Sequence, residues 1–201
     1  MKTLSEFQLN ALKEFIDAGT AHAAAALSEL LDKKAIVNIS KTKVVDVTKI
    51  PEHLGGEHLN IIGLYFKVSG DIKGNILLIF DEKQAGMLLN ILLAGIDPGD
   101  TPEFDSMRKS ALMELGNIMT NSYLNALAHM IDMKMLLSVP RYAADELASV
   151  IDFLLIELIA AVDQALLMDI IIKLPETEIN GSFIIVPDTV SLEKIFNRAG
   201  Q

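Results

Sequence analysis

Two stretches of the chain decide its fold because they repeat each other: NALKEFIDAGTAHAAAALSELLDKKAIVNIS at residues 10–40 and SALMELGNIMTNSYLNALAHMIDMKMLLSVP at residues 110–140. They align without a gap at an offset of 100 residues, which indicates an internal duplication. Apolar identities such as Leu27/Leu127 can be explained by helix packing alone. A polar identity between the two copies is more informative, because packing does not require it.

A second repeated segment extends the duplication into the β-rich part of each half. Residues 71–80, DIKGNILLIF, resemble residues 178–187, EINGSFIIVP, at an offset of 107. The second half has thus gained 107 − 100 = 7 residues between Pro140 and Glu178, where a feature specific to that half is expected. The half-repeats span about residues 5–94 and 102–199, and no flexible linker separates them. We predict a single pseudo-twofold domain.

Composition excludes several classes of protein. The absence of cysteine rules out a disulfide framework and thiolate metal sites and is compatible with a reducing cytoplasm. The most apolar region, residues 150–174, carries five charged side chains, which a membrane span would tolerate only at a high free-energy cost. A formal charge of −10 opposes nonspecific binding to nucleic acid. We expect a soluble cytoplasmic protein with neither a membrane nor a nucleic acid as partner.

Local patterns predict an α+β fold. The first half should contain a long helix, a strand, a hairpin and a short helix begun by Asp81, at residues 6–32, 35–47, 59–69 with 72–80, and 81–94. The second half should repeat this order from a helix at residues 102–132, with an inserted amphipathic helix at residues 142–162. Strands grouped in hairpins favour a mainly antiparallel sheet, and two long helices should flank it.

Three polar residues lie on one face of the second long helix. Ser110, Glu114 and Asn117 are spaced i, i+4 and i+7, so their side chains line up over two turns. Gly116 lies in the helix interior, where it costs about 1 kcal/mol relative to alanine, and we attribute it to another backbone or a ligand that comes close. Taken alone, Glu and Asn on an exposed helix face are most often simply solvated. Glu114 differs from that case because Glu14 repeats it in the first copy.

The pattern Ser110-x3-Glu114-x2-Asn117-x22-Pro140, with ELGNIM at residues 114–119, resembles the signature of the CheC family of chemotaxis phosphatases, related to CheX and FliY. The duplicated layout resembles that family as well. The resemblance implies hydrolysis of the phosphorylated aspartate of a CheY-type response regulator. It implies that Glu114 grips the regulator's lysine and that Asn117 orients the attacking water, with Ser110 and Gly116 beside them in the binding face. The Mg²⁺ would be supplied by the regulator, so we expect no metal or cofactor of the chain's own.

An amide suits this chemistry because it can hold a water without adding negative charge near a phosphoryl group. The first copy has Glu14 in register with Glu114, but Asp17 in place of Asn117 and Ile16 in place of Gly116. An anion at about 4 Å from another repels it by about 4 kcal/mol at an effective dielectric of 20. We therefore predict one working site, in the second half.

The inserted helix has two readings. It either packs against the sheet or, as the resemblance implies, holds a receptor deamidase of the CheD type, with Asp145 as an acidic contact. An alternative function is accordingly an adaptor that regulates such a deamidase and has weak phosphatase activity. A third class, a structural flagellar-switch component like FliY, is disfavoured because we expect no added domain after Gln201 and no binding extension before Ser5.

Overall fold

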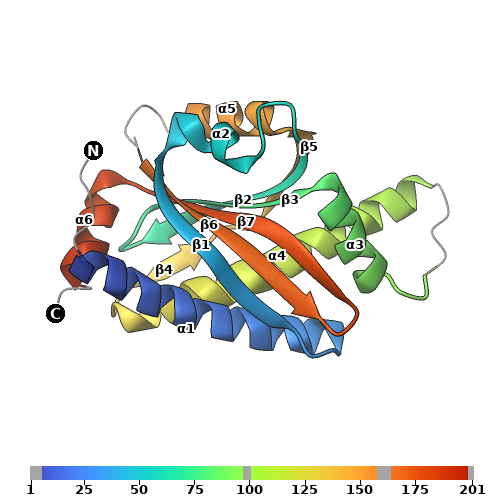
Figure 1. Ribbon diagram of the computed structural model, residues 1–201, viewed down its shortest axis with the longest axis horizontal. Helices are drawn as coiled ribbons and strands as arrows, with labels where there is room; N and C mark the ends of the chain where they lie inside the picture. The colour runs from blue at the N-terminus through green and yellow to red at the C-terminus, as the bar shows by residue number, and fades with distance from the viewer. Residues whose placement is uncertain (1–5, 97–100, 158–163, 199–201) are drawn as a thin grey trace.

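The chain is described by a computed structural model for residues 6–96, 101–157 and 164–198 (Figure 1). Its elements, in chain order, are α1 (Glu6–Leu31), β1 (Ile36–Asp46), the short 3₁₀ helix η1 (Val47–Lys49), α2 (Ile50–Leu54), β2 (Asn60–Gly70), β3 (Gly74–Asp81), α3 (Glu82–Leu92), α4 (Pro102–Met130), β4 (Met135–Leu137), β5 (Arg141–Glu146), α5 (Leu147–Glu157), β6 (Gln164–Leu174), β7 (Thr177–Pro187) and α6 (Thr189–Arg198).

The described strands form one antiparallel sheet in which the two halves of the chain interleave. The strand order is β1-β6-β7-β3-β2-β4, and β5 also pairs with β2. The first strand of each half pairs with the hairpin of the other half, β1 with β6 and β4 and β5 with β2. The hairpins meet at the centre, where β3 pairs with β7. The predicted α+β class with a mainly antiparallel sheet is confirmed.

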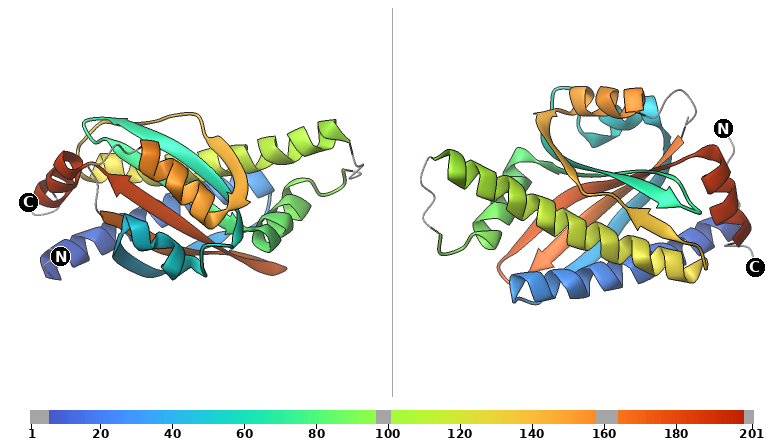
Figure 2. Two further views of the ribbon diagram at one scale, coloured as in Figure 1. Left: turned by 90° about the horizontal axis from the view of Figure 1, so that it is seen from above. Right: turned by 180° about the vertical axis from the view of Figure 1, so that it is seen from behind.

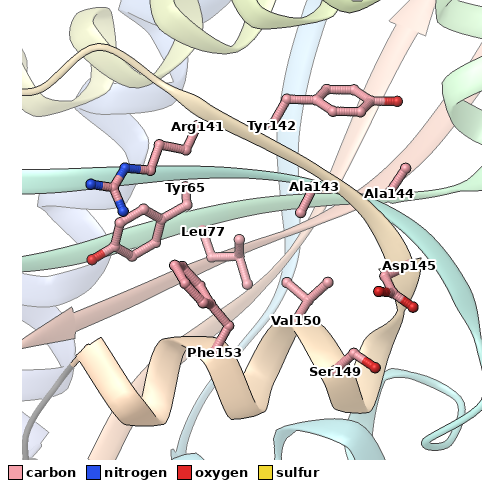
Figure 3. A pocket seen from close by; sticks show the side chains of 10 residues that line it. All are labelled: Tyr65, Leu77, Arg141, Tyr142, Ala143, Ala144, Asp145, Ser149, Val150 and Phe153. Carbon is pink, nitrogen blue, oxygen red and sulfur yellow. The ribbon is translucent and has the colours of Figure 1, made fainter.

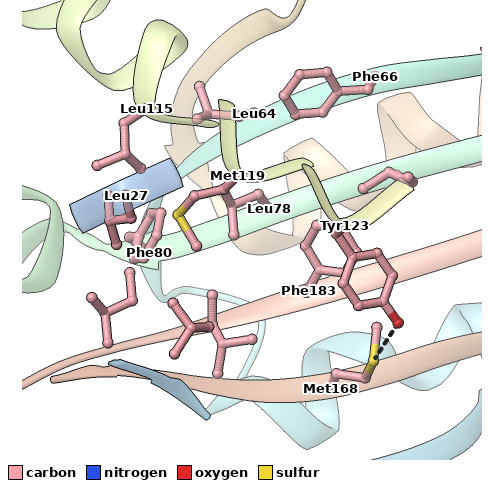
Figure 4. Close-up of a cluster of buried hydrophobic side chains, with 14 of the residues drawn as sticks. Leu27, Leu64, Phe66, Leu78, Phe80, Leu115, Met119, Tyr123, Met168 and Phe183 are labelled. Atoms are coloured by element: carbon pink, nitrogen blue, oxygen red, sulfur yellow. Dashed lines mark hydrogen bonds between the residues drawn. The ribbon is translucent and has the colours of Figure 1, made fainter. Parts of the chain in front are cut away.

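Helices cover both faces of this sheet. The long helices α1 and α4 lie side by side across one face, seen from behind in Figure 2, and α2 and α5 lie over the other. Alternate side chains of β2 point to opposite faces of the sheet. Leu64 belongs to the core under α4, and Tyr65 belongs to the core under α5. Figure 4 shows the larger core, where Tyr123 of α4 packs on Phe183 of β7 at a ring-centroid distance of 5.1 Å. Burial of these side chains on both faces is the main stabilising contribution.

The predicted long helices agree with the structure to within two residues at each end described. The starting signals predicted for the short helices α3 and α6 are confirmed. The Asp81 carboxylate accepts a hydrogen bond from the backbone N–H of Gln84 at 2.7 Å, and Asp188 caps α6 in the same way through Ser191 N–H at 2.7 Å. Such side-chain caps satisfy backbone donors that a helix leaves unpaired at its start.

The helix predicted at residues 142–162 is wrong at its start. Residues Arg141–Glu146 form strand β5, and α5 begins at Leu147; residues 158–162 lie outside the described part of the chain. The alanines and the glutamate of this segment tolerate a helix, but pairing with β2 satisfies the backbone groups of a strand that would otherwise be exposed at the edge. In the alignment of the two halves, the offset of 100 residues already puts this segment in register with residues 41–46 of strand β1.

The seven-residue gain enlarges an element that the first half also has. Helix α2, of 5 residues, follows β1 as α5, of 11 residues, follows β5. The prediction of an inserted helix is therefore corrected to that of a lengthened one. The buried Pro140 interrupts the strand between β4 and β5. The equivalent position of the first half is Ser40, and β1 shifts its register there, between Ile39 and Lys41. Proline lacks the N–H that a continuous ladder needs.

Candidate active site

Helix α4 displays one face to the sheet and the opposite face outward. It starts at Thr101, whose hydroxyl accepts a hydrogen bond from Phe104 N–H at 3.3 Å, with Pro102 in the first turn. Its buried side chains recur every three or four residues, as Leu112, Leu115, Met119 and Tyr123. The helix is thus fixed in rotation by its apolar face, which determines which side chains point away from the sheet.

Gly116 belongs to the sheet side of α4. A Cβ built on it would lie 2.3 Å from Cδ1 of Leu64 in β2, and both residues are buried. The close approach predicted at this glycine is present, but the group that approaches is a core side chain, and the expectation of a backbone or ligand there is wrong. Gly116 therefore sets how near α4 packs on β2, and it does not form part of an outward binding face.

Ser110, Glu114 and Asn117 lie on the outward side of α4. Ser110 and Glu114 are exposed and Asn117 is half-buried, so the structure brings these three predicted residues together on one helical stripe. Asn121, one turn further on, continues the stripe. Its Nδ2–H donates a hydrogen bond to Oδ1 of Asn117 at 2.8 Å. Sequence analysis missed Asn121, although its spacing of i+11 from Ser110 extends the same pattern.

Cationic side chains flank the first turns of this stripe. The ammonium of Lys109 lies 5.7 Å from the centre of the Tyr142 ring in β5, within reach of a cation–π attraction. Partial burial raises the pKa of Tyr142, an effect that Arg108 opposes and Asp105 reinforces. The Tyr142 phenol therefore stays neutral at physiological pH, and its contact with Lys109 links β5 to α4.

The stripe can bind and orient but does not enclose a small molecule. It presents an acceptor carboxylate at Glu114 and a donor–acceptor amide at Asn117, both on the outer face of a helix. Small-molecule sites are usually concave and bury most of their ligand. This arrangement suits a reacting group that lies inside a cleft of another protein, which the helix face can reach.

The corresponding face of α1 lacks the amide pair. Glu14 lies within α1, and its side chain is outside the described part of the structure. Asp17 is exposed, and its backbone carbonyl accepts a hydrogen bond from the hydroxyl of Thr20 at 2.9 Å. Ala21 stands in register with Asn121. Neither amide of the second-half stripe therefore has a counterpart in the first half.

A separate groove of about 410 Å³ lies between β5 and α5 (Figure 3). Tyr65, Leu77, Val150 and Phe153 contribute its apolar lining, and Asp145 lies at one end. The Tyr65 and Phe153 rings meet edge to face at a centroid distance of 6.3 Å. None of Ser110, Glu114 and Asn117 lines this groove, so it is distinct from the stripe on α4.

Asp145 is exposed on strand β5, opposite Ile61 of β2, and not in the first turn of a helix as predicted. Its Oδ1 accepts a hydrogen bond from Glu146 N–H at 2.7 Å. The structure thus separates Asp145 from Glu114 and Asn117, as predicted, but assigns it to a different element.

Within the described residues, no three or more His, Cys, Asp or Glu side chains gather in a way that could hold a metal ion. In the same part of the chain, no helix combines the length and the apolar character needed to cross a membrane.

Solved structures share the fold. Thermotoga maritima FliY superposes with a TM-score of 0.79 at 14% identity, covering 98% of both chains. A chain of the CheX–CheY–BeF₃–Mg²⁺ complex from Borrelia burgdorferi superposes with a TM-score of 0.56 at 16% identity, covering 87% of this chain and 97% of that one. At these identities the likeness defines a structural class, the class of FliY and CheX.

The amino-acid sequence identifies the family within this structural class. The CheC-like family matches residues 107–142, the segment that contains Ser110, Glu114, Asn117 and Pro140. The chain is 30% identical over 201 residues to the CheY-P phosphatase CheC of Bacillus subtilis (strain 168), an alignment that covers 98% of this chain and 96% of its relative. The chain belongs to the CheC family.

Proposed function

We propose that this protein is a phosphatase that hydrolyses the aspartyl phosphate of a CheY-type response regulator. The observation that carries the proposal is the outward stripe on α4, where Glu114 and Asn117 lie side by side in a chain related over its whole length to a CheY-P phosphatase. A chain of the same fold class also occurs in a complex of CheX with CheY.

The two side chains have different roles in this proposal. The exposed Glu114 carboxylate accepts hydrogen bonds from a cationic side chain of the regulator and thereby fixes the position of α4 over the regulator's active site. Asn117 enters that site and holds a water in line with the phosphorus–oxygen bond. Attack of the water on phosphorus breaks the bond to the aspartyl oxygen and releases inorganic phosphate. Positioning of this kind supplies much of the rate gain in phosphoryl transfer.

The regulator supplies the remaining groups. A phosphoryl transition state spreads negative charge over its oxygens, and the stripe offers no described cation at its centre to neutralise it. We propose that the Mg²⁺ comes with the phosphorylated regulator and that this chain contributes no cofactor of its own. Ser110, exposed one turn before Glu114, is proposed to contact the rim of the regulator's active site.

A phosphate-release assay tests the proposal. A CheY-type regulator phosphorylated with a small phosphodonor is mixed with the wild-type protein or with the double variant Glu114→Ala/Asn117→Ala. We expect the wild type to accelerate phosphate release and the double variant to leave the regulator's intrinsic rate. Equal rates with and without the wild-type protein would overturn the proposed function.

We also propose a deamidase of the CheD type as a second partner, bound at the groove between β5 and α5. The observation that favours this site is Phe153, whose side chain is 46% exposed beside an apolar groove; partly exposed aromatic side chains are frequent anchors of protein interfaces. Because the relative from Bacillus subtilis reported above is named a CheY-P phosphatase, we place this contact beside the phosphatase role and do not treat it as the main function.

We propose a cytoplasmic location for these activities. The absence of cysteine supports it, since proteins of oxidising compartments commonly rely on disulfides.

A further inference from the structure

The amide of Asn117 is held by its neighbour Asn121. The hydrogen bond from Asn121 Nδ2 to Asn117 Oδ1 measures 2.8 Å, joins residues one helical turn apart, and lies on the outward face of α4, where both side chains are half-buried. An asparagine amide rotates over a broad range about its terminal torsion when nothing holds it. This bond gives the Asn117 amide one orientation.

The orientation has a chemical consequence. With Oδ1 directed toward Asn121, the Nδ2–H₂ end of Asn117 is presented away from that neighbour, while Oδ1 retains a second lone pair. The amide therefore enters a partner's active site with its donor end defined. An unheld amide would populate both orientations, and part of the population would present the wrong end.

We infer that Asn121 is a positioning residue that orients the Asn117 amide for the proposed hydrolysis. The inference rests on the proposed function, because it assigns Asn121 a role through Asn117. The duplication supports it. In the first half, Asp17 and Ala21 stand where Asn117 and Asn121 stand in the second, so both members of the pair are absent together from the copy that lacks the amide.

The test measures kcat and KM for regulator dephosphorylation in Asn121→Ala and Asn121→Asp. We expect Asn121→Ala to lower kcat by about five- to tenfold, the effect of one lost hydrogen bond, with KM for the regulator unchanged. Asn121→Asp cannot donate to Oδ1 and should accept from Asn117 Nδ2 instead, which turns the amide over and lowers kcat at least as much. The exposed Asn125, one turn further along α4, provides the matched control Asn125→Ala, which should keep wild-type constants.

A double-mutant cycle with Asn117→Ala separates positioning from a structural role. If Asn121 acts through Asn117, Asn121→Ala has no further effect on kcat once Asn117 is alanine. Equal losses in both backgrounds, a wild-type kcat for Asn121→Ala, or a change in KM alone would overturn the inference and leave the proposed function intact. Wild-type activity of Asn117→Ala would instead overturn the site assignment on which the inference rests. If Asn121→Ala fails to fold, as judged by circular dichroism, Asn121→Asp of nearly equal volume decides between the same outcomes.

Discussion

At the scale of single residues, Glu114 and Asn117 are neighbours on one helix with different chemistry. Glu114→Ala should weaken regulator binding, because it removes a charged acceptor, whereas Asn117→Ala should lower kcat by about a hundredfold or more, since it removes the group that orients the water. Both side chains lie on the outward face, so the thermal unfolding midpoint should change little. Steady-state phosphate release over a range of regulator concentrations measures kcat and KM for each variant. Wild-type turnover in the double variant would contradict the assignment.

Gly116 has a packing role that can be measured separately from activity. In Gly116→Ala the new methyl group would meet Leu64 Cδ1 at 2.3 Å, inside a core where Leu64 has no exposed surface. Overpacking of this kind costs about 1–3 kcal/mol, which exceeds the gain of about 1 kcal/mol in helix propensity. We expect Gly116→Ala to be less stable in urea unfolding.

Gly86 in α3 is the matched control for that experiment. It is also a helical glycine, but nothing lies within 4 Å of a Cβ built on it. Gly86→Ala should therefore raise the free energy of unfolding by about 0.5–1 kcal/mol. Equal effects of the two substitutions would show that Leu64 does not restrict Gly116.

At the scale of elements, α1 and α4 are sequence copies that differ in their outward chemistry. We predict that Glu14→Ala leaves phosphatase activity nearly unchanged, because Asp17 and Ala21 replace the two amides of α4 and an anion near a phosphoryl group is unfavourable. The variant is compared with the wild type in the phosphate-release assay. Loss of more than about half of the activity in a folded Glu14→Ala protein would show that α1 contributes a working site.

The groove between β5 and α5 forms a second functional element in our proposal. Asp145→Lys reverses a charge at the end of this groove and should weaken binding of a CheD-type deamidase by about tenfold or more in titration calorimetry, the loss of a charged contact. Phosphatase activity should persist, since Asp145 lies on β5 and the stripe lies on α4. The control is Asp152→Lys, an exposed aspartate of α5 that does not line the groove. If Asp145→Lys bound the deamidase with wild-type affinity, Asp145 would not be part of the interface. If the wild-type protein did not bind the deamidase, the proposed partner would be wrong.

At the scale of the whole molecule, the interleaved sheet predicts that neither half folds alone. The first half would lose β6, the partner of β1, and the second half would lose β2, the partner of β5, which leaves strand edges unpaired. We expect residues 1–96 and 101–201, expressed separately, to show no cooperative unfolding transition, and the mixed fragments to regain one. Circular dichroism and thermal denaturation measure both. A cooperative transition in either fragment alone would contradict the proposal of a single domain.

Patterns that depend on neighbours along the chain could be predicted from the sequence. The duplication follows from aligning the two halves of the sequence. The long helices, the caps at Asp81 and Asp188, and the shared face of Ser110, Glu114 and Asn117 follow from periodicities and short-range hydrogen bonds. The helices, the caps and the shared face change little with tertiary context, because each depends on residues within one or two turns of the backbone.

Features that depend on distant parts of the chain were decided by the tertiary structure alone. Strand β5 pairs with β2 of the other half, and β1 pairs with β6. Gly116 is required because Leu64 lies against it. The sequence by itself determined which residues share a face of α4; the packing of α4 on the sheet decided that this face points outward. The physical reason is that local preference amounts to less than about 1 kcal/mol per residue, whereas burial of one large apolar side chain contributes about 1.5–3 kcal/mol, so non-local packing prevails wherever the two conflict.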